Sequence, residues 1–230
     1  AELVREDATG QPNIKLAERS YHEATWGPIA DSIASEARFL LARTGISNGE
    51  PRVLELNTGA GSITYSLIRA GFVIRHTVEN NYTIHQWSHE NLQRLGIDGN
   101  IGFVLADAWE FVHQAAQHDA RFDIALADPP WRQFHFRKRS HFSFEEMKPD
   151  GRKIVPHLLQ VAPIVGIKAP DFLRDTEVMQ LAKDLNAGVF LLKHRLQVGE
   201  TQLHEKFAFF TREDLGMRGM EEKSVALSIG

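Results

Sequence analysis

The residues most suggestive of chemistry are Asp128, Pro129, Pro130 and Trp131, which follow an apolar run. Two adjacent prolines suit neither a helix interior nor a strand interior, because proline lacks an N–H donor and has a fixed φ. A carboxylate oxygen and a proline carbonyl oxygen can each accept one N–H bond of an amine, while an aromatic ring stacks on the planar group that carries it. The four residues therefore predict a catalytic site that positions an amine nitrogen, and the alternative is a strand-ending turn with a buried tryptophan.

A second set of candidate residues lies upstream, around the glycine-bearing turn "ELNTGAG". Gly59 and Gly61 allow backbone N–H groups to approach a ligand closely, and an acid at the end of the next strand, Glu79, can accept both hydroxyls of a ribose. The turn lacks the G-x-G-x-x-G pattern of dinucleotide sites, because Asn57 stands where a glycine is common. Each feature alone is also typical of an ordinary turn or a solvated acid, but their order and spacing, continued by Asp107, predict a nucleoside cofactor.

These candidates fall at the ends of strands in an alternating pattern. Buried apolar runs predict strands at 51–56, 72–80, 101–109, 122–131 and 164–170, and a strand pair within 189–211. Helical spacing predicts helices at 28–43, 63–71, 82–97, 110–118, 154–160 and 175–188. Strands that alternate with helices predict a parallel α/β sheet, and its ligands bind beyond the carboxyl ends of the strands. The last two strands predict an antiparallel closing pair.

With these elements in place, the chain resembles class I S-adenosylmethionine-dependent methyltransferases that methylate amines, whose motif is [D/N/S]-P-P-[Y/F/W]. The likeness extends from about Pro51 to Thr211. Within that superfamily it is most similar to the trimethylguanosine synthases, through "ELNTGAGSIT", "SHENLQRLGI", "IGFVLAD", "DIALADPPW", "FSFEEMKPDGRKI" and "KFAFF". The resemblance implies a Rossmann-like three-layer sandwich, with a mostly parallel seven-stranded sheet and an antiparallel last strand.

The resemblance also implies roles for individual residues. It places the methionine part of the cofactor against the glycine turn, its ribose on Glu79 and its adenine amine on Asp107. The full set implied for the cofactor is Glu55, Asn57, Thr58, Gly59, Ala60, Gly61, Glu79, Asn80, Asp107 and Ala108. The set implied for the substrate is Trp131, Arg132, Phe134 and Arg137. Asp128 departs from the serine that is usual in trimethylguanosine synthases and instead resembles adenine and other amine methyltransferases.

The segment from Arg132 to Lys153 carries seven basic and three acidic residues with phenylalanines between them. It suits a loop that grips phosphates and stacks bases, or a lid over a smaller anionic substrate. An exposed cationic loop whose aromatic side chains enter the core is an equal alternative. The histidines show no compact metal-ligand spacing with carboxylates, so we expect no metal.

Composition limits the classes of protein that this chain can represent. A net charge of −4 disfavours nonspecific binding to nucleic acid, and the first residues lack the apolar core of a signal peptide. We expect a cytoplasmic protein without a membrane anchor, with an N-terminal extension and helix at 1–45 and a methyltransferase domain at 46–230. Cysteine is absent, which excludes disulfides and thiolate metal sites.

Three functions stay open on the sequence alone. The first is transfer of a methyl group from S-adenosylmethionine to an exocyclic amine of a nucleobase in RNA or a nucleotide. The second is transfer to a small-molecule or peptide amine, which the acidic charge favours. The third is a noncatalytic partner subunit, which the intact glycines and acids disfavour. The sequence does not determine the oligomeric state.

Overall fold

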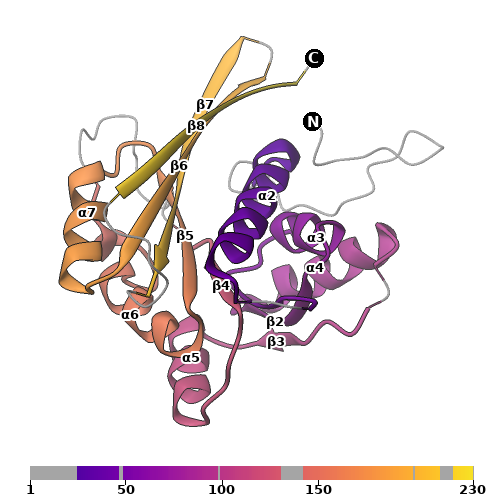
Figure 1. Ribbon diagram of the computed structural model, residues 1–230. Coiled ribbons are helices and arrows are strands. Elements are labelled where there is room, and N and C mark those ends of the chain that lie inside the picture. The colour runs from indigo at the N-terminus through magenta and orange to yellow at the C-terminus, as the bar shows by residue number, and fades with distance from the viewer. Residues whose placement is uncertain are drawn as a thin grey trace.

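The protein is an eight-stranded sheet with helices packed on both faces (Figure 1). The computed structural model describes residues 25–46, 49–97, 99–130, 142–198, 200–212 and 220–229. The predicted α/β three-layer sandwich is confirmed.

Strands and helices alternate through the first half of the described chain. The elements are α2 Gly27–Thr44, β1 Arg52–Leu56, α3 Ser62–Arg69, β2 Val73–Glu79, α4 Tyr82–Arg94, β3 Phe103–Leu105, α5 Ala108–Gln117 and β4 Ile124–Ala127. The second half contains η2 Phe144–Glu146, α6 Gly151–Val161, β5 Ile164–Pro170, α7 Asp175–Asp184, β6 Gly188–Val198, β7 Thr201–Thr211 and β8 Met220–Ile229. The predicted elements up to residue 211 are all present.

The strand order is β3-β2-β1-β4-β5-β7-β6-β8. β1 to β5 are mutually parallel, and β7 is antiparallel to both β5 and β6. β8 then pairs in parallel with β6 at the edge of the sheet. The mostly parallel sheet with a reversed strand is therefore confirmed, but it has one strand more than the seven predicted, and the reversed strand is not the last.

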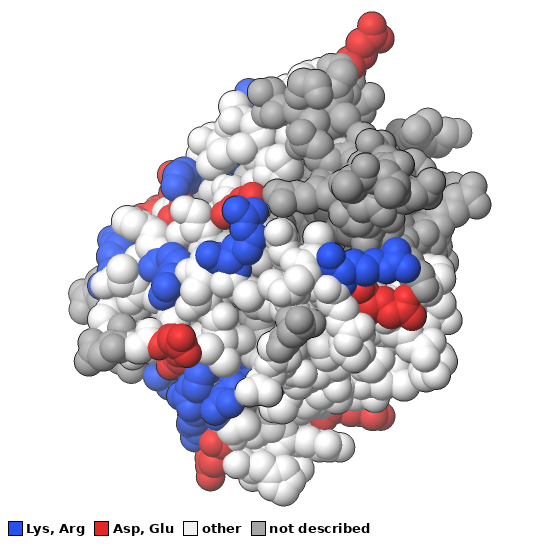
Figure 2. Space-filling view, turned by 90° about the vertical axis from the view of Figure 1, so that its right-hand side faces the viewer, with Lys and Arg blue, Asp and Glu red and all other residues white. Residues whose placement is uncertain are grey.

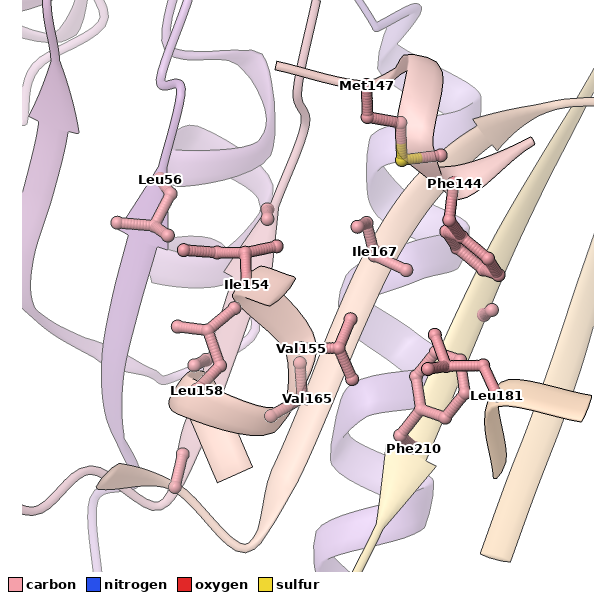
Figure 3. Close-up of a cluster of buried hydrophobic side chains, with 14 of the residues drawn as sticks. Leu56, Phe144, Met147, Ile154, Val155, Leu158, Val165, Ile167, Leu181 and Phe210 are labelled. Carbon is pink, nitrogen blue, oxygen red and sulfur yellow. The ribbon is translucent and has the colours of Figure 1, made fainter. Parts of the chain in front are cut away.

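Two apolar clusters fill the two faces of the sheet. On one face, α2 and α3 contribute residues such as Ile33, Leu40 and Leu67. On the other face, α5, α6 and α7 pack against alternate residues of the same strands. Figure 3 shows Ile154, Val155 and Leu158 of α6 lying against β5 in this second cluster. The strands are thus buried on both sides, as parallel strands usually are.

α2 belongs to the segment predicted as an N-terminal extension, and its apolar side packs on the sheet. The division of the chain at residue 45 stays a prediction, and residues 1–24 lie outside the described part. No helix among the described residues is both long and apolar enough to cross a bilayer.

Candidate functional site

The candidate site is built on the turn between β1 and α3. Asn57, Gly59 and Gly61 all have positive φ, at 60°, 57° and 89°, a backbone conformation that favours glycine and tolerates asparagine. The turn is fastened to the neighbouring strand, because the backbone N–H groups of Asn57 and Thr58 both donate to the carbonyl of Val78, at 2.8 and 3.3 Å. The turn therefore lies across the carboxyl ends of β1 and β2.

Glu79, the last residue of β2, connects this turn to α4. Its Oε2 accepts the backbone N–H of Gly59 at 3.2 Å, and its Oε1 accepts that of Asn81 at 3.0 Å. Asn81 caps α4 by accepting from the N–H groups of Thr83 and Ile84, and the predicted site residue Asn80 is exposed beside it. Each carboxylate oxygen has a second lone pair, so Glu79 retains capacity to accept from a ligand.

Unpartnered polar atoms lie in the turn itself. Asn57 Oδ1 and Ser62 Oγ are buried and have no hydrogen-bond partner among the described residues. Ala60 is held by its carbonyl oxygen, which accepts from Asn91 Nδ2 of α4 at 3.1 Å. Since buried polar groups are normally hydrogen-bonded, the two unpartnered oxygens are available to an external donor.

Glu55 of β1 is buried beneath the turn. Its Oε2 accepts hydrogen bonds from the hydroxyls of Thr64 and Thr77, on α3 and β2. Burial raises the pKa of Glu55 to about 8, and the nearby charge of Asp128 acts in the same direction. The carboxyl is therefore mostly protonated at neutral pH, and in that form it can donate as well as accept.

Asp107 follows β3 but does not end it, because the strand stops at Leu105. The predicted strand to residue 109 is too long, since Asp107 caps α5 and Ala108 begins that helix. Asp107 Oδ1 accepts the backbone N–H groups of Trp109 and Glu110, at 2.8 and 3.2 Å. Both bonds use one oxygen, so Oδ2 has no partner among the described residues.

Asp128 stands immediately after β4, beside the glycine turn. Its backbone N–H donates to the carbonyl of Leu56, the last residue of β1, at 3.2 Å. Pro129 is buried and Pro130 is half-buried. The structure thus brings the carboxylate of the predicted amine site next to the predicted cofactor residues.

The substrate residues predicted after Pro130 cannot be placed. Trp131, Arg132, Phe134 and Arg137 lie outside the described residues, so their roles stay predictions. Further along the basic segment, Phe142 and Phe144 are fully buried in the core. For these two phenylalanines, the option of stacking on bases is therefore wrong, and the option of packing in the core is confirmed.

Sequence analysis missed two residues that contact Asp128. Its Oδ2 accepts from the hydroxyl of Thr25 at 2.9 Å and from Lys168 Nζ at 3.2 Å. Thr25 precedes α2 and Lys168 lies in β5. The only available signal was a lysine within the apolar strand "IVGIKAP", where a charge is unusual.

No cluster of three or more histidine, aspartate or glutamate side chains within the described ranges could hold a metal ion.

Comparison with known families assigns the chain to one of them. The family described as conserved hypothetical protein 95 matches residues 24–147, more than half of the 230-residue chain. The chain belongs to this family. The conserved hypothetical protein 95 segment includes the glycine turn, Glu79, Asp107 and Asp128. No curated protein matches the chain.

Solved structures share the fold of this conserved hypothetical protein 95 member. A SAM-dependent methyltransferase from Agrobacterium tumefaciens matches with a TM-score of 0.58 at 15% identity, over 79% of this chain and 62% of that one. A putative RNA methyltransferase from Pyrococcus horikoshii matches with a TM-score of 0.53 at 15% identity, over 79% and 84%. The magnesium protoporphyrin IX methyltransferase of Synechocystis, solved with bound SAM, matches with a TM-score of 0.54 at 13% identity, over 86% of both chains.

These likenesses establish the fold, which is the Rossmann-like fold of the methyltransferases. The chain spans less than two thirds of the Agrobacterium protein.

Proposed function

We propose that this protein is an S-adenosylmethionine-dependent N-methyltransferase that methylates an exocyclic amine of a nucleobase in RNA or in a nucleotide, in the manner of trimethylguanosine synthases. The observation that carries the proposal is the position of Asp128 and the two prolines directly beside the glycine turn, joined to it through the hydrogen bond to Leu56. Amine-positioning groups and nucleoside-binding groups then share one edge of the sheet.

The residues of the turn fit S-adenosylmethionine. The unpartnered Asn57 Oδ1 can accept from its amino group, and the remaining lone pairs of Glu79 can accept from the ribose hydroxyls. The free Oδ2 of Asp107 can accept from the adenine amine. A Cβ at Gly59 would have no described neighbour closer than 4.0 Å, so the turn leaves open space there.

The chemistry is a direct transfer that needs little from the protein beyond placement. When bound, S-adenosylmethionine supplies an electrophilic methyl group. Asp128 Oδ1 and the carbonyl of Pro129 accept the two N–H bonds of the substrate amine and so direct its lone pair, while Trp131 stacks on the base. The amine R–NH2 becomes R–NH–CH3, and one proton is released to water.

The choice of a nucleobase as substrate rests on the D-P-P-W sequence and on the fold shared with the putative RNA methyltransferase of Pyrococcus horikoshii. A small-molecule or peptide amine is the second candidate, favoured by the net charge of −4. In agreement with it, Figure 2 shows the described basic side chains of one face in separate groups, with acidic side chains among them. Long RNA usually binds to a more continuous basic surface.

The first test is calorimetric titration with S-adenosylhomocysteine. We expect micromolar binding to the parent protein and at least about 10-fold weaker binding to Glu79→Ala. The variant would lose the hydrogen bonds that the ribose hydroxyls donate to the Glu79 carboxylate, and the loss of such bonds to a charged group is large enough for this change in affinity. Glu110→Ala is the control, since this exposed acid lies beside Asp107 but outside the proposed site. Absence of binding to the parent would contradict the proposal and favour a noncatalytic partner.

The second test is transfer of labelled methyl groups to RNA transcripts, mononucleotides and small amines, with the products identified by mass spectrometry. Asp128→Ala and Trp131→Ala should each lower the rate strongly on the true substrate, because both would act on the reacting amine. Full activity in both variants would show that the amine site is misassigned. A methyl group found on oxygen or carbon would contradict N-methylation.

A further inference from the structure

A lysine is buried directly behind the carboxylate of Asp128. The side chains of Lys168 and Glu205 are 2% and 1% exposed, whereas that of Asp128 is 19% exposed. Lys168 Nζ lies 2.7 Å from Thr25 Oγ1, 3.2 Å from Asp128 Oδ2 and 3.4 Å from Glu205 Oε2. The other members of this network are buried, and the network reaches the protein surface only at Asp128.

The network crosses four adjacent strands on the α2 face of the sheet. Asp128 follows β4, Lys168 lies in β5 and Glu205 in β7, and His194 of β6 is the register partner of Glu205. His194 is buried without a hydrogen-bond partner among the described residues. Burial and the charge of Lys168 lower the pKa of His194 to about 4, so its ring is neutral at physiological pH.

Stability alone does not account for this arrangement. Removing charged groups from water is costly, and apolar residues of similar volume are often at least as stabilising as a buried ion pair. The network does determine how the Asp128 carboxylate is hydrogen-bonded, because both of its donors to Asp128 bind the same oxygen.

Thr25 and Lys168 both donate to Oδ2, and Oδ1 receives no hydrogen bond from the described residues. We propose that Thr25 and Lys168 are positioning residues, which hold the Asp128 carboxylate in one orientation and leave Oδ1 to accept the N–H of the methyl-accepting amine. This inference rests on the proposed function. It assigns a role in the reaction to residues 103 and 40 positions away from Asp128.

Substitution at Thr25 provides the sharpest test. Thr25→Val keeps the shape but removes the hydroxyl, and Thr25→Ser keeps the hydroxyl. If Thr25 orients Asp128, Thr25→Val should lower kcat about 10- to 100-fold, as small misplacements of catalytic groups do. The KM for S-adenosylmethionine should stay unchanged, and Thr25→Ser should restore most of the activity. If Thr25 only stabilised the fold, its substitution would change the melting temperature but would not lower kcat while leaving KM unchanged.

Two controls match the test variants. Thr211→Val removes a buried hydroxyl that has no partner among the described residues, and it should leave kcat unchanged. Lys206→Met removes a partly buried lysine that pairs with Asp175 away from the site, whereas Lys168→Met removes the lysine behind Asp128. We expect a loss of activity only in Lys168→Met, even if both lysine variants melt at lower temperature.

Methyl transfer is measured with labelled S-adenosylmethionine on RNA transcripts, mononucleotides and small amines. Equal kcat for the parent and Thr25→Val, in a parent that methylates an amine, would overturn this inference alone. A parent that binds no S-adenosylhomocysteine and methylates no amine would overturn the proposed function, and this inference with it.

Discussion

Glu55 is the residue at which the protonation state of the site is most strongly perturbed. Its carboxyl lies in the interior between β1, β2 and α3, and its pKa rises from 4.5 to about 8 because burial disfavours the charge. The folded protein therefore holds a proton that the unfolded chain releases above pH 4.5. Glu55 stabilises the fold fully below that pH, and the contribution is lost as the pH rises to about 8.

This shift gives a testable pH dependence. Between pH 6 and 8, the free energy of unfolding of the parent should fall by up to about 1.4 kcal/mol per pH unit through Glu55. Glu55→Gln keeps a neutral side chain of the same shape and should lose this part of the slope. Urea unfolding of both proteins at several pH values measures the difference. Parallel slopes would show that Glu55 is ionised in the folded protein.

At single residues, sequence analysis was most informative where a side chain ends or directly follows a strand. Glu79 and Asp128 could be selected in this way, and the structure brings both to the glycine turn. Thr25 and Lys168 could not, because their contacts with Asp128 depend on the packing of α2 and β5 around it. Long-range contacts of this kind leave no local pattern in a sequence, and the lysine within an apolar strand was the only signal.

Among the strands, β8 is the one that sequence analysis did not predict. Most of its described side chains are half-buried or exposed, since it lies at the edge of the sheet, and it therefore lacks the apolar run of a buried strand. Val225 and Leu227 pack against the apolar cluster of the α2 face, and charged side chains also attach β8 to α2. Lys223 pairs with Glu36 at 2.6 Å, and Glu221 pairs with Arg43 through both carboxylate oxygens. Edge strands often carry such charges, which also oppose aggregation.

The two pairs between β8 and α2 should differ in their contributions to stability. Glu36 is 2% exposed beside a Lys223 side chain that is 53% exposed, so Lys223→Met leaves a buried carboxylate without its partner. We expect this change to lower the free energy of unfolding by about 2–4 kcal/mol. Glu221→Gln breaks an exposed pair and should have a smaller effect. Urea denaturation of the two variants compares them, and equal losses would contradict the prediction.

For the molecule as a whole, the alternating pattern was sufficient to predict the fold class. The rule that parallel strands are joined by crossover helices leaves few arrangements, and the structure has one of them. Two features of the sheet do not follow from that rule. The insertion of β7 between β5 and β6 and the return of the chain to form β8 both depend on pairing between distant segments.

The stability of the whole molecule should depend on pH through two buried groups with opposite effects. Glu55 makes the fold less stable as the pH rises from 4.5 to about 8. His194, whose pKa is lowered from 6.5 to about 4, acts in the other direction. Between these two pH values the unfolded chain binds a proton that the folded protein does not, so stability is lost as the pH falls from 6.5 to 4.

Comparison of variants separates the two contributions. His194→Leu removes the buried imidazole but leaves Glu55 unchanged, so the difference between variant and parent cancels the part due to Glu55. That difference should shift in favour of the variant by up to about 1.4 kcal/mol for each pH unit below 6.5. Urea unfolding at pH 4.5, 5.5 and 6.5 measures it, with the exposed His204→Leu on β7 as the control. A difference that does not change with pH would mean that His194 takes up its proton inside the folded protein as readily as in the unfolded chain.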